Sequence, residues 1–371
     1  MMVAANASGS FRKPLRSVLT RIPRLFVGAS GMIGMLGAIQ WSTIGLVRPD
    51  GQPAPEPKRQ VVVDFSLDTV GAFGVSRTLV TPVGAARQPL RAAMQLHDLS
   101  DLGQPKGLDV EGQAVHHCVI SPSGTHVALS TREGAFGLID LRDRGGSIRW
   151  IPGVERNWIA RLYWSPGSDR VLAATEHSIL CWSLPAGELE YQLPLTTALP
   201  PCLAVAGDGH HFVAWAGGRL RLCELQTGRT LRDFPMEPNV LSLVYGQSSG
   251  IVVTSGDEGV IATSIDDGGQ IWQVPPSPAL KFPIALSGDE EWLAYVVREF
   301  DQHGTRFNRV VVCRLATGET VTVIEPGVGE ITGVGFGRDG TLSVWGDCGA
   351  IVGRNIESGS ELWRYEFPVG E

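Results

Sequence analysis

The pattern of apolar and polar positions repeats along this chain about every 40 residues. A short apolar or β-branched strand ends each time in an aliphatic residue followed by a turn that carries glycine. The seven copies centre on Leu99, Leu141, Leu184, Leu225, Ile265, Leu315 and Ile356. A fixed period of this length indicates repeated supersecondary units, each of which buries its apolar face only against a neighbour.

The unit around Leu141 shows the predicted elements most clearly. Strands are expected over 115–121, 125–131, 135–141 and 147–153, separated by turns at Gly- and Pro-containing sites. No long helical period occurs after residue 60. Four antiparallel strands per unit predict the blades of a β-propeller, and seven units predict seven blades over residues 61–371.

The first unit is the most irregular. Residues 81–84 can form its first turn, which squeezes its second strand into 88–94 and leaves 61–67 free to pair with the last blade. Alternatively, 61–67 is itself the first strand of the first blade. The sequence leaves both arrangements open.

Each unit has a turn and then a strand that ends in a phrase such as WSLPAG (182–187) or CRLATG (313–318), and this order resembles WD40 repeats. The segment GGQIWQV (268–274) resembles the outer strand of quinoprotein-like blades. The resemblance covers about residues 76–371 and implies an all-β, seven-bladed propeller of four-stranded blades. The chain departs from WD40 proteins in lacking the Trp-Asp pair and the opening Gly-His of each repeat. Blade rigidity is therefore expected to rest on apolar packing.

Residues 1–60 differ in composition from the rest of the chain. A basic segment, 1–24, precedes 23 uncharged residues, 25–47, and a Pro-rich spacer, 48–60. The uncharged segment is long enough to cross a bilayer as a helix, and the preceding arginines place the N-terminus in the cytoplasm and the propeller on the non-cytoplasmic side of an inner membrane. A cleaved signal, and hence secretion, or a cytoplasmic protein remain alternatives. Small residues at 30, 34, 38 and 42 would allow the helix to form a homodimer.

Charge and cysteine content exclude some functions. Residues 60–371 hold 23 basic and 36 acidic side chains, an unfavourable balance for nucleic-acid binding. The six cysteines include no CxxC pair and are expected to be buried and unpaired. The neighbouring histidines at 116–117 and at 210–211 would point to opposite faces of a strand, so neither pair is expected to bind a metal as a pair.

No motif for catalysis stands out, and we expect no catalytic residue, cofactor or metal. Five of the ten tryptophans, at 182, 215, 272, 345 and 363, recur at related repeat positions, which predicts packing between blades. The sixth unit is stretched by an enlarged hairpin, 298–309. We expect this hairpin and the connections between blades to form a face that binds a protein or peptide partner. The candidate contact residues are Arg156, Trp158, Arg298, Phe300, Arg306, Phe307 and Arg309.

The predicted function is a non-catalytic, membrane-tethered scaffold. The alternative is a propeller enzyme, either a quinoprotein-like oxidoreductase or a hydrolase with its site at the mouth of the channel.

Overall fold

The computed structural model describes the strands 58–67, 73–82, 91–98 and 106–108, and then residues 115–131, 133–143, 147–151, 158–195, 200–236, 239–276, 283–300, 306–337 and 339–366. Every regular element in these ranges is a β-strand. The predicted segments 1–24 and 25–47 lie outside them. Of the Pro-rich spacer predicted at 48–60, only the last three residues are described, and they begin the first strand, so the prediction is wrong for these three residues. Among the residues described, no helix is long and apolar enough to span a bilayer.

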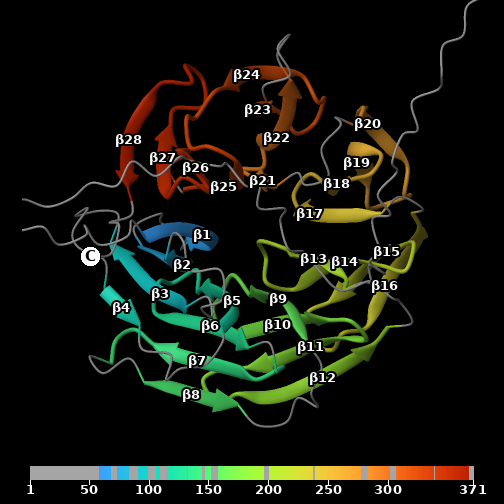
Figure 1. Cartoon of the computed structure of the whole chain (residues 1–371). Coiled ribbons are helices and arrows are strands. Elements are labelled where there is room, and N and C mark those ends of the chain that lie inside the picture. The colour runs from blue at the N-terminus through green and yellow to red at the C-terminus, as the bar shows by residue number, and fades with distance from the viewer. Residues whose placement is uncertain are drawn as a thin grey trace, which may run out of the picture. The chain divides into compact units, whose positions relative to one another are not determined.

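Seven antiparallel sheets of four strands follow one another along the chain, with their strands in chain order, and the six from β5 onward are regular blades (Figure 1). The first two blades contain β5 (Val115–Ile120), β6 (His126–Thr131), β7 (Phe136–Asp140) and β8 (Ile148–Ile151), and then β9 (Ile159–Trp164), β10 (Arg170–Thr175), β11 (Ser178–Ser183) and β12 (Glu188–Pro194). The next two contain β13 (Cys202–Val205), β14 (His211–Ala216), β15 (Arg219–Glu224) and β16 (Thr230–Pro235), and then β17 (Val240–Gly246), β18 (Ile251–Gly256), β19 (Gly259–Ser264) and β20 (Gln270–Val274). The last two contain β21 (Ile284–Leu286), β22 (Trp292–Phe300), β23 (Arg306–Arg314) and β24 (Thr320–Ile324), and then β25 (Ile331–Phe336), β26 (Leu342–Gly346), β27 (Ala350–Arg354) and β28 (Glu361–Glu366).

The structure is therefore an all-β propeller, with six regular blades rather than the predicted seven. The remaining sheet is irregular and contains β1 (Lys58–Leu67), β2 (Phe73–Pro82), β3 (Arg91–Asp98) and β4 (Lys106–Leu108). Its first two strands have ten residues each and its last has three, because the sequence here lacks the closely spaced turns of the other units. Segment 61–67 lies in the first strand of this sheet, and β1 contacts β5 and β25. The predicted strand at 88–94 is wrong, because β3 begins at Arg91 and ends at Asp98.

A glycine with positive φ closes the turn between the third and fourth strands of five blades. In each of these turns the glycine N–H donates to the carbonyl four residues earlier, as Gly318 does to Arg314 over 2.9 Å. The φ of Gly318 is +71°, a conformation that side chains with Cβ rarely adopt. The equivalent glycines are Gly187, Gly228, Gly268 and Gly359. This geometry explains why the repeated phrases of these five blades end in glycine.

Each of these turns packs under the outer strand of the preceding blade. A Cβ on Gly318 would lie 2.9 Å from the ring of Trp272 in β20, and one on Gly228 would lie 2.7 Å from Leu193 in β12. A side chain of the outer strand also donates to a backbone carbonyl of the next blade's turn. Tyr191 Oη reaches the Leu225 carbonyl over 2.8 Å, and Trp272 Nε1 reaches the Leu315 carbonyl over 2.8 Å.

Apolar side chains fill the spaces between neighbouring blades. One cluster combines Leu172 and Cys181 of the β9–β12 blade with Phe212 and Cys223 of the β13–β16 blade. Trp182 stacks on Phe136 of the preceding blade, with ring centroids 4.4 Å apart. The interior is thus continuous from blade to blade, as the repeat predicted.

The tryptophans divide into two groups. Trp182, Trp215 and Trp272 pack between blades, as predicted. Trp345 and Trp363 cover glycines of their own blade, because Cβ atoms at Gly333 and Gly353 would each lie 2.2 Å from these rings. Their packing between blades stays a prediction.

Five of the six cysteines are buried, but Cys348 is exposed, so the prediction that all six are buried is wrong for this residue. Cys348 lies in the tight hairpin between β26 and β27, where the chain turns outside the sheet. Cys202 and Cys223 lie on β13 and β15, two strands apart, as predicted, and all six thiols are free.

Candidate functional site

The β22–β23 hairpin is longer than its counterparts in the other regular blades. Its strands pair over nine positions, from Trp292 with Arg314 to Phe300 with Arg306. The hairpin of β18 and β19 pairs over six, ending at Gly256 with Gly259. The three additional pairs are Arg298 with Asn308, Glu299 with Phe307 and Phe300 with Arg306, and we call them the arm. The arm confirms that the enlarged hairpin predicted at 298–309 exists, and most of that segment forms strand.

The base of the arm is attached to the connection that leads into the next blade. Arg298 forms an ion pair with Glu330, and its Nε donates to Asn308 Oδ1 over 3.2 Å. Asn308 in turn donates to the Gly329 carbonyl over 3.4 Å. The Arg298 side chain is only 17% exposed, so the ion pair is partly shielded from solvent. These contacts restrict the direction in which the arm leaves its blade.

Arg309 holds the other side of the arm. Its Nη1 lies 3.0 Å from Glu299 and its Nη2 lies 2.8 Å from Glu325, just after β24. Its guanidinium also lies over the Phe307 ring, 4.8 Å from the centroid, within the range of a cation–π interaction. Arg309 therefore fixes the orientation of Phe307 and has its charge balanced by two carboxylates.

The structure brings together some of the predicted contact residues. Arg298, Phe307 and Arg309 belong to the arm and its base, and Phe300 and Arg306 form its last pair, although their side chains lie outside the described part. Arg156 also lies outside the described residues. Trp158 belongs to another blade, directly before β9, where its ring centroid lies 5.1 Å from that of His116. The arm and Trp158 thus lie on different blades, and a binding face that includes both stays a prediction.

Sequence reasoning missed the partners that position the arm. Glu325, Asn308 and Glu330 have no distinctive pattern, and two of them lie in the connection EPGVGE (325–330). Their role depends on the proximity of this connection to the extended hairpin, which only the fold creates.

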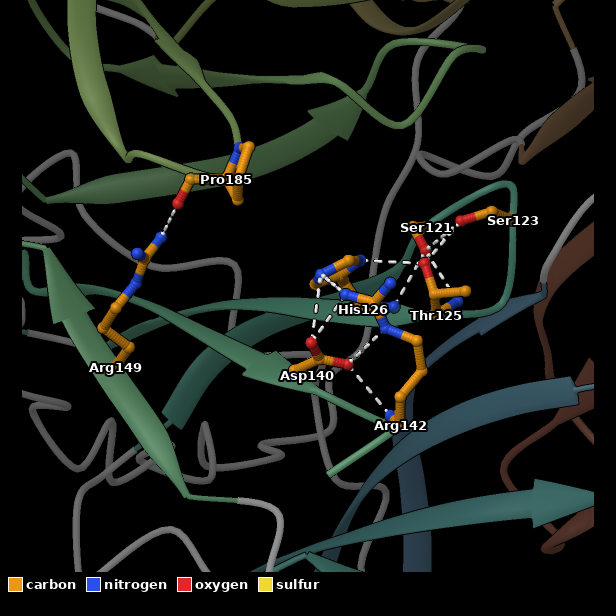
Figure 2. A network of polar contacts seen from close by, with 8 residues as sticks. All are labelled: Ser121, Ser123, Thr125, His126, Asp140, Arg142, Arg149 and Pro185. Atoms are coloured by element: carbon orange, nitrogen blue, oxygen red, sulfur yellow. Dashed lines mark hydrogen bonds and ion pairs between the residues drawn. The ribbon is translucent and has the colours of Figure 1, made fainter. Parts of the chain in front are cut away.

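A second polar cluster joins the first turn of the β5–β8 blade to the end of β7 (Figure 2). Thr125 Oγ1 lies 2.8 Å from His126 Nδ1, and Asp140 lies on the other side of the imidazole, 3.8 Å from Nε2. Arg142 binds both Asp140 oxygens, at 2.9 and 2.7 Å, and holds the pKa of this carboxyl well below its usual range. Burial lowers the pKa of His126.

The cluster has the residue types of a hydroxyl–imidazole–carboxylate relay but the geometry of a turn. The Nε2 to Asp140 separation exceeds hydrogen-bonding distance, and Asp140 is already bound by Arg142. Ser121 Oγ accepts the backbone N–H groups of Thr125 and His126, at 3.1 and 3.0 Å. Ser165 does the same for Asp169 and Arg170 in the next blade. This repetition indicates that the cluster stabilises the turn.

Within the described residues, no group of three or more His, Cys, Asp or Glu side chains is arranged to hold a metal ion. His116 and His117 are consecutive residues of β5, and the His211 ring is hydrogen-bonded to Asp208 at 2.9 Å.

Comparison with known proteins identifies no family for this chain. No family model matches it. Glutamate–tRNA ligase 1 of Methylorubrum extorquens (strain PA1) is 31% identical over 155 residues, which is 40% of this chain and 28% of the ligase. The chain thus spans less than a third of the length of this curated relative, and the match does not show the family.

Proposed function

We propose that this protein is a non-catalytic scaffold that binds a protein or peptide partner through the β22–β23 arm. The observation that carries the proposal is the attachment of the arm to the next blade through Arg298, Asn308 and Arg309. Rigid scaffolds that present fixed loops lose little conformational entropy on binding. An extension held on both sides is suited to this role.

The residues of the arm and its base divide into two proposed roles. Arg298 and Arg309 are engaged in intramolecular ion pairs, so they position the arm. Phe307, held under the Arg309 guanidinium, and the end pair of Phe300 and Arg306 are the proposed partner contacts. Aromatic and arginine side chains are the ones that most often dominate binding energy at interfaces.

The test replaces Phe300, Arg306 and Phe307 together by alanine in the full-length chain. The matched control replaces Arg229 and Leu231 by alanine. Both side chains are exposed, at the start of the outer strand of another blade. Partner proteins recovered with the wild-type chain should be lost with the arm variant and retained with the control, while both variants keep the wild-type melting temperature. Equal recovery by the arm variant would remove the arm as the binding surface.

We also propose that the sheet β1–β4 takes the seventh place in the ring, as in WD40 and quinoprotein-like propellers. The contacts of β1 with β5 and with β25 support this arrangement. Deleting residues 58–108 should then lower the melting temperature sharply, because the inner strands of two blades would lose their neighbour. An unchanged melting temperature would exclude this role for the sheet.

The proposed location is the non-cytoplasmic side of an inner membrane, with residues 25–47 as the anchor. The support is the 23-residue uncharged stretch and the arginines before it. A tag after Glu371 should be digested by protease added to intact spheroplasts. Protection of the tag would place the propeller in the cytoplasm. A homodimer through the small residues of the anchor is part of the same proposal, testable by crosslinking in the membrane.

The ligase similarity does not extend the proposal to an aminoacylation activity. It covers 28% of that enzyme, and residues 60–371 carry 36 acidic against 23 basic side chains. That balance disfavours an RNA partner, whose phosphates are bound mainly by cations.

A further inference from the structure

The turn that follows β17 receives a carboxylate from the neighbouring blade. Glu290 Oε1 accepts the backbone N–H groups of Gln247 and Ser248, at 2.9 and 3.1 Å. Its Oε2 accepts the backbone N–H of Ser249 at 3.0 Å and the Ser249 hydroxyl at 3.1 Å. Three successive backbone N–H groups therefore converge on one anion.

Glu290 reaches this turn from a strained backbone conformation. Its φ is +59°, in the left-handed region, where the equivalent position of four other blades is occupied by Gly124, Gly209, Gly250 and Gly340. A residue with a Cβ is costly at such a position and is retained where surrounding contacts hold it. The contacts of the carboxylate with the preceding blade supply that restraint.

The same direction of contact recurs in other blades with uncharged groups. Ser168, the other non-glycine residue with positive φ among those described, accepts the backbone N–H of Ser123 at 3.1 Å. Gln247 Oε1 accepts the backbone N–H of Asp208 at 3.0 Å, and Gln247 Nε2 donates to Asp208 Oδ2 at 2.5 Å. In each case a turn receives a side chain from the first turn of the following blade. Glu290 provides a carboxylate in this position, and it binds three backbone amides rather than one.

We propose that the Gln247–Ser249 turn is a carboxylate-binding site that the chain fills with its own Glu290, and that this intramolecular ligand locks the β17–β20 and β21–β24 blades together. Consecutive N–H groups in a turn form a concave anion site, and hydrogen bonds to a charged acceptor are stronger than neutral ones. The ligand class is a small carboxylate. The proposal is independent of partner binding by the arm.

The test vacates the site in the full-length chain with Glu290→Gly and offers acetate as a replacement ligand. Glycine relieves the backbone strain, so a lower melting temperature would report the lost carboxylate contacts. The melting temperature should fall by several degrees in chloride and recover in part when acetate replaces chloride at constant ionic strength. Hydrogen exchange of the peptide spanning 243–251 should quicken in the variant and slow again with acetate.

The matched control is Ser168→Gly, which changes the same conformational position but removes a hydroxyl. Acetate should have no more effect on this variant than on the wild type. If Glu290→Gly is as stable as the wild type, or if acetate acts equally on all three proteins, the proposal is wrong. Glu290→Gln adds a test of charge, because it keeps an acceptor oxygen. Wild-type stability and exchange in this variant would show that the site does not require a carboxylate.

Discussion

The indole N–H of Trp272 donates to the backbone carbonyl of Leu315 in the next blade over 2.8 Å. Tyr191 makes the equivalent bond to Leu225 two blades earlier along the chain, also at 2.8 Å. The two side chains differ in size and chemistry but bind equivalent turns in two different blades. Contacts between blades in this propeller therefore include a repeated hydrogen bond as well as apolar packing.

The first prediction concerns this bond. Trp272→Phe keeps an aromatic ring over Gly318 but removes the donor, so the free energy of unfolding should fall by about 1 kcal/mol or somewhat more. Tyr191→Phe should cost a similar amount. Trp363→Phe is the control, because that ring covers Gly353 of its own blade. Equal losses in denaturant unfolding for all three variants would show that the bond to the next blade has no particular importance.

The second prediction separates backbone strain from steric fit. Gly318→Ala must place a Cβ 2.9 Å from Trp272 at a φ of +71°. Gly340→Ala has a similar φ of +78° but meets nothing within 4 Å. We expect about 1 kcal/mol of strain in Gly340→Ala and a clearly larger loss in Gly318→Ala, measured by urea unfolding. Losses of the same size would contradict the observed packing.

These two features also show how far the sequence could predict the fold. The glycines at the ends of the repeated phrases indicate the turns, because the positive φ that requires glycine is a property of the local backbone, and the four-strand units follow from the apolar runs. The partner of each turn could be predicted only in part. Trp272 is one of the tryptophans that recur at related repeat positions, which predicts its packing between blades. Tyr191 is a different residue type, so the sequence does not indicate that it makes the same contact as Trp272. Glu290 stands where glycine is usual, and its target lies 43 residues earlier in another blade.

The candidate site was predictable to a similar extent. An enlarged hairpin is visible as an irregular spacing in the repeat, so the position of the arm could be anticipated. The ion pair of Arg298 with Glu330 could not be anticipated from the sequence, because it depends on which connection passes the base of the hairpin.

The third prediction tests the attachment of the arm. Arg298→Ala removes the ion pair with Glu330 and the bond to Asn308, which should free the arm without unfolding the blade. Trypsin should then cleave after Arg306 or Arg309 several times faster than in the wild type, as followed by mass spectrometry. Arg229→Ala, which removes an arginine from another blade, serves as the control. An unchanged cleavage rate would show that Arg298 does not restrain the arm.

The fourth prediction concerns alkaline pH. Burial raises the pKa of Cys181 and of Cys313 from an ordinary value of 9.0 to about 12. Between these values the unfolded chain loses thiol protons that the folded chain keeps, so the unfolding free energy should fall as the pH rises above 9. The double variant Cys181→Ala/Cys313→Ala should have a flatter profile over this range. Cys348→Ala, at the exposed thiol, should flatten the profile less than the double variant, although partial burial raises the pKa of this thiol as well. A double variant with the wild-type slope would contradict the burial effect.

The most direct test of the central proposal is site-specific photocrosslinking from the arm in living cells. A photoreactive phenylalanine analogue at Phe307 should yield a discrete crosslinked product with one protein. The same analogue at Leu231, on the outer strand of another blade, should not yield that product. Crosslinking to the same protein from both positions would contradict a partner-binding role for the arm. The absence of any product from Phe307, in cells that express the variant at the wild-type level, would contradict it as well.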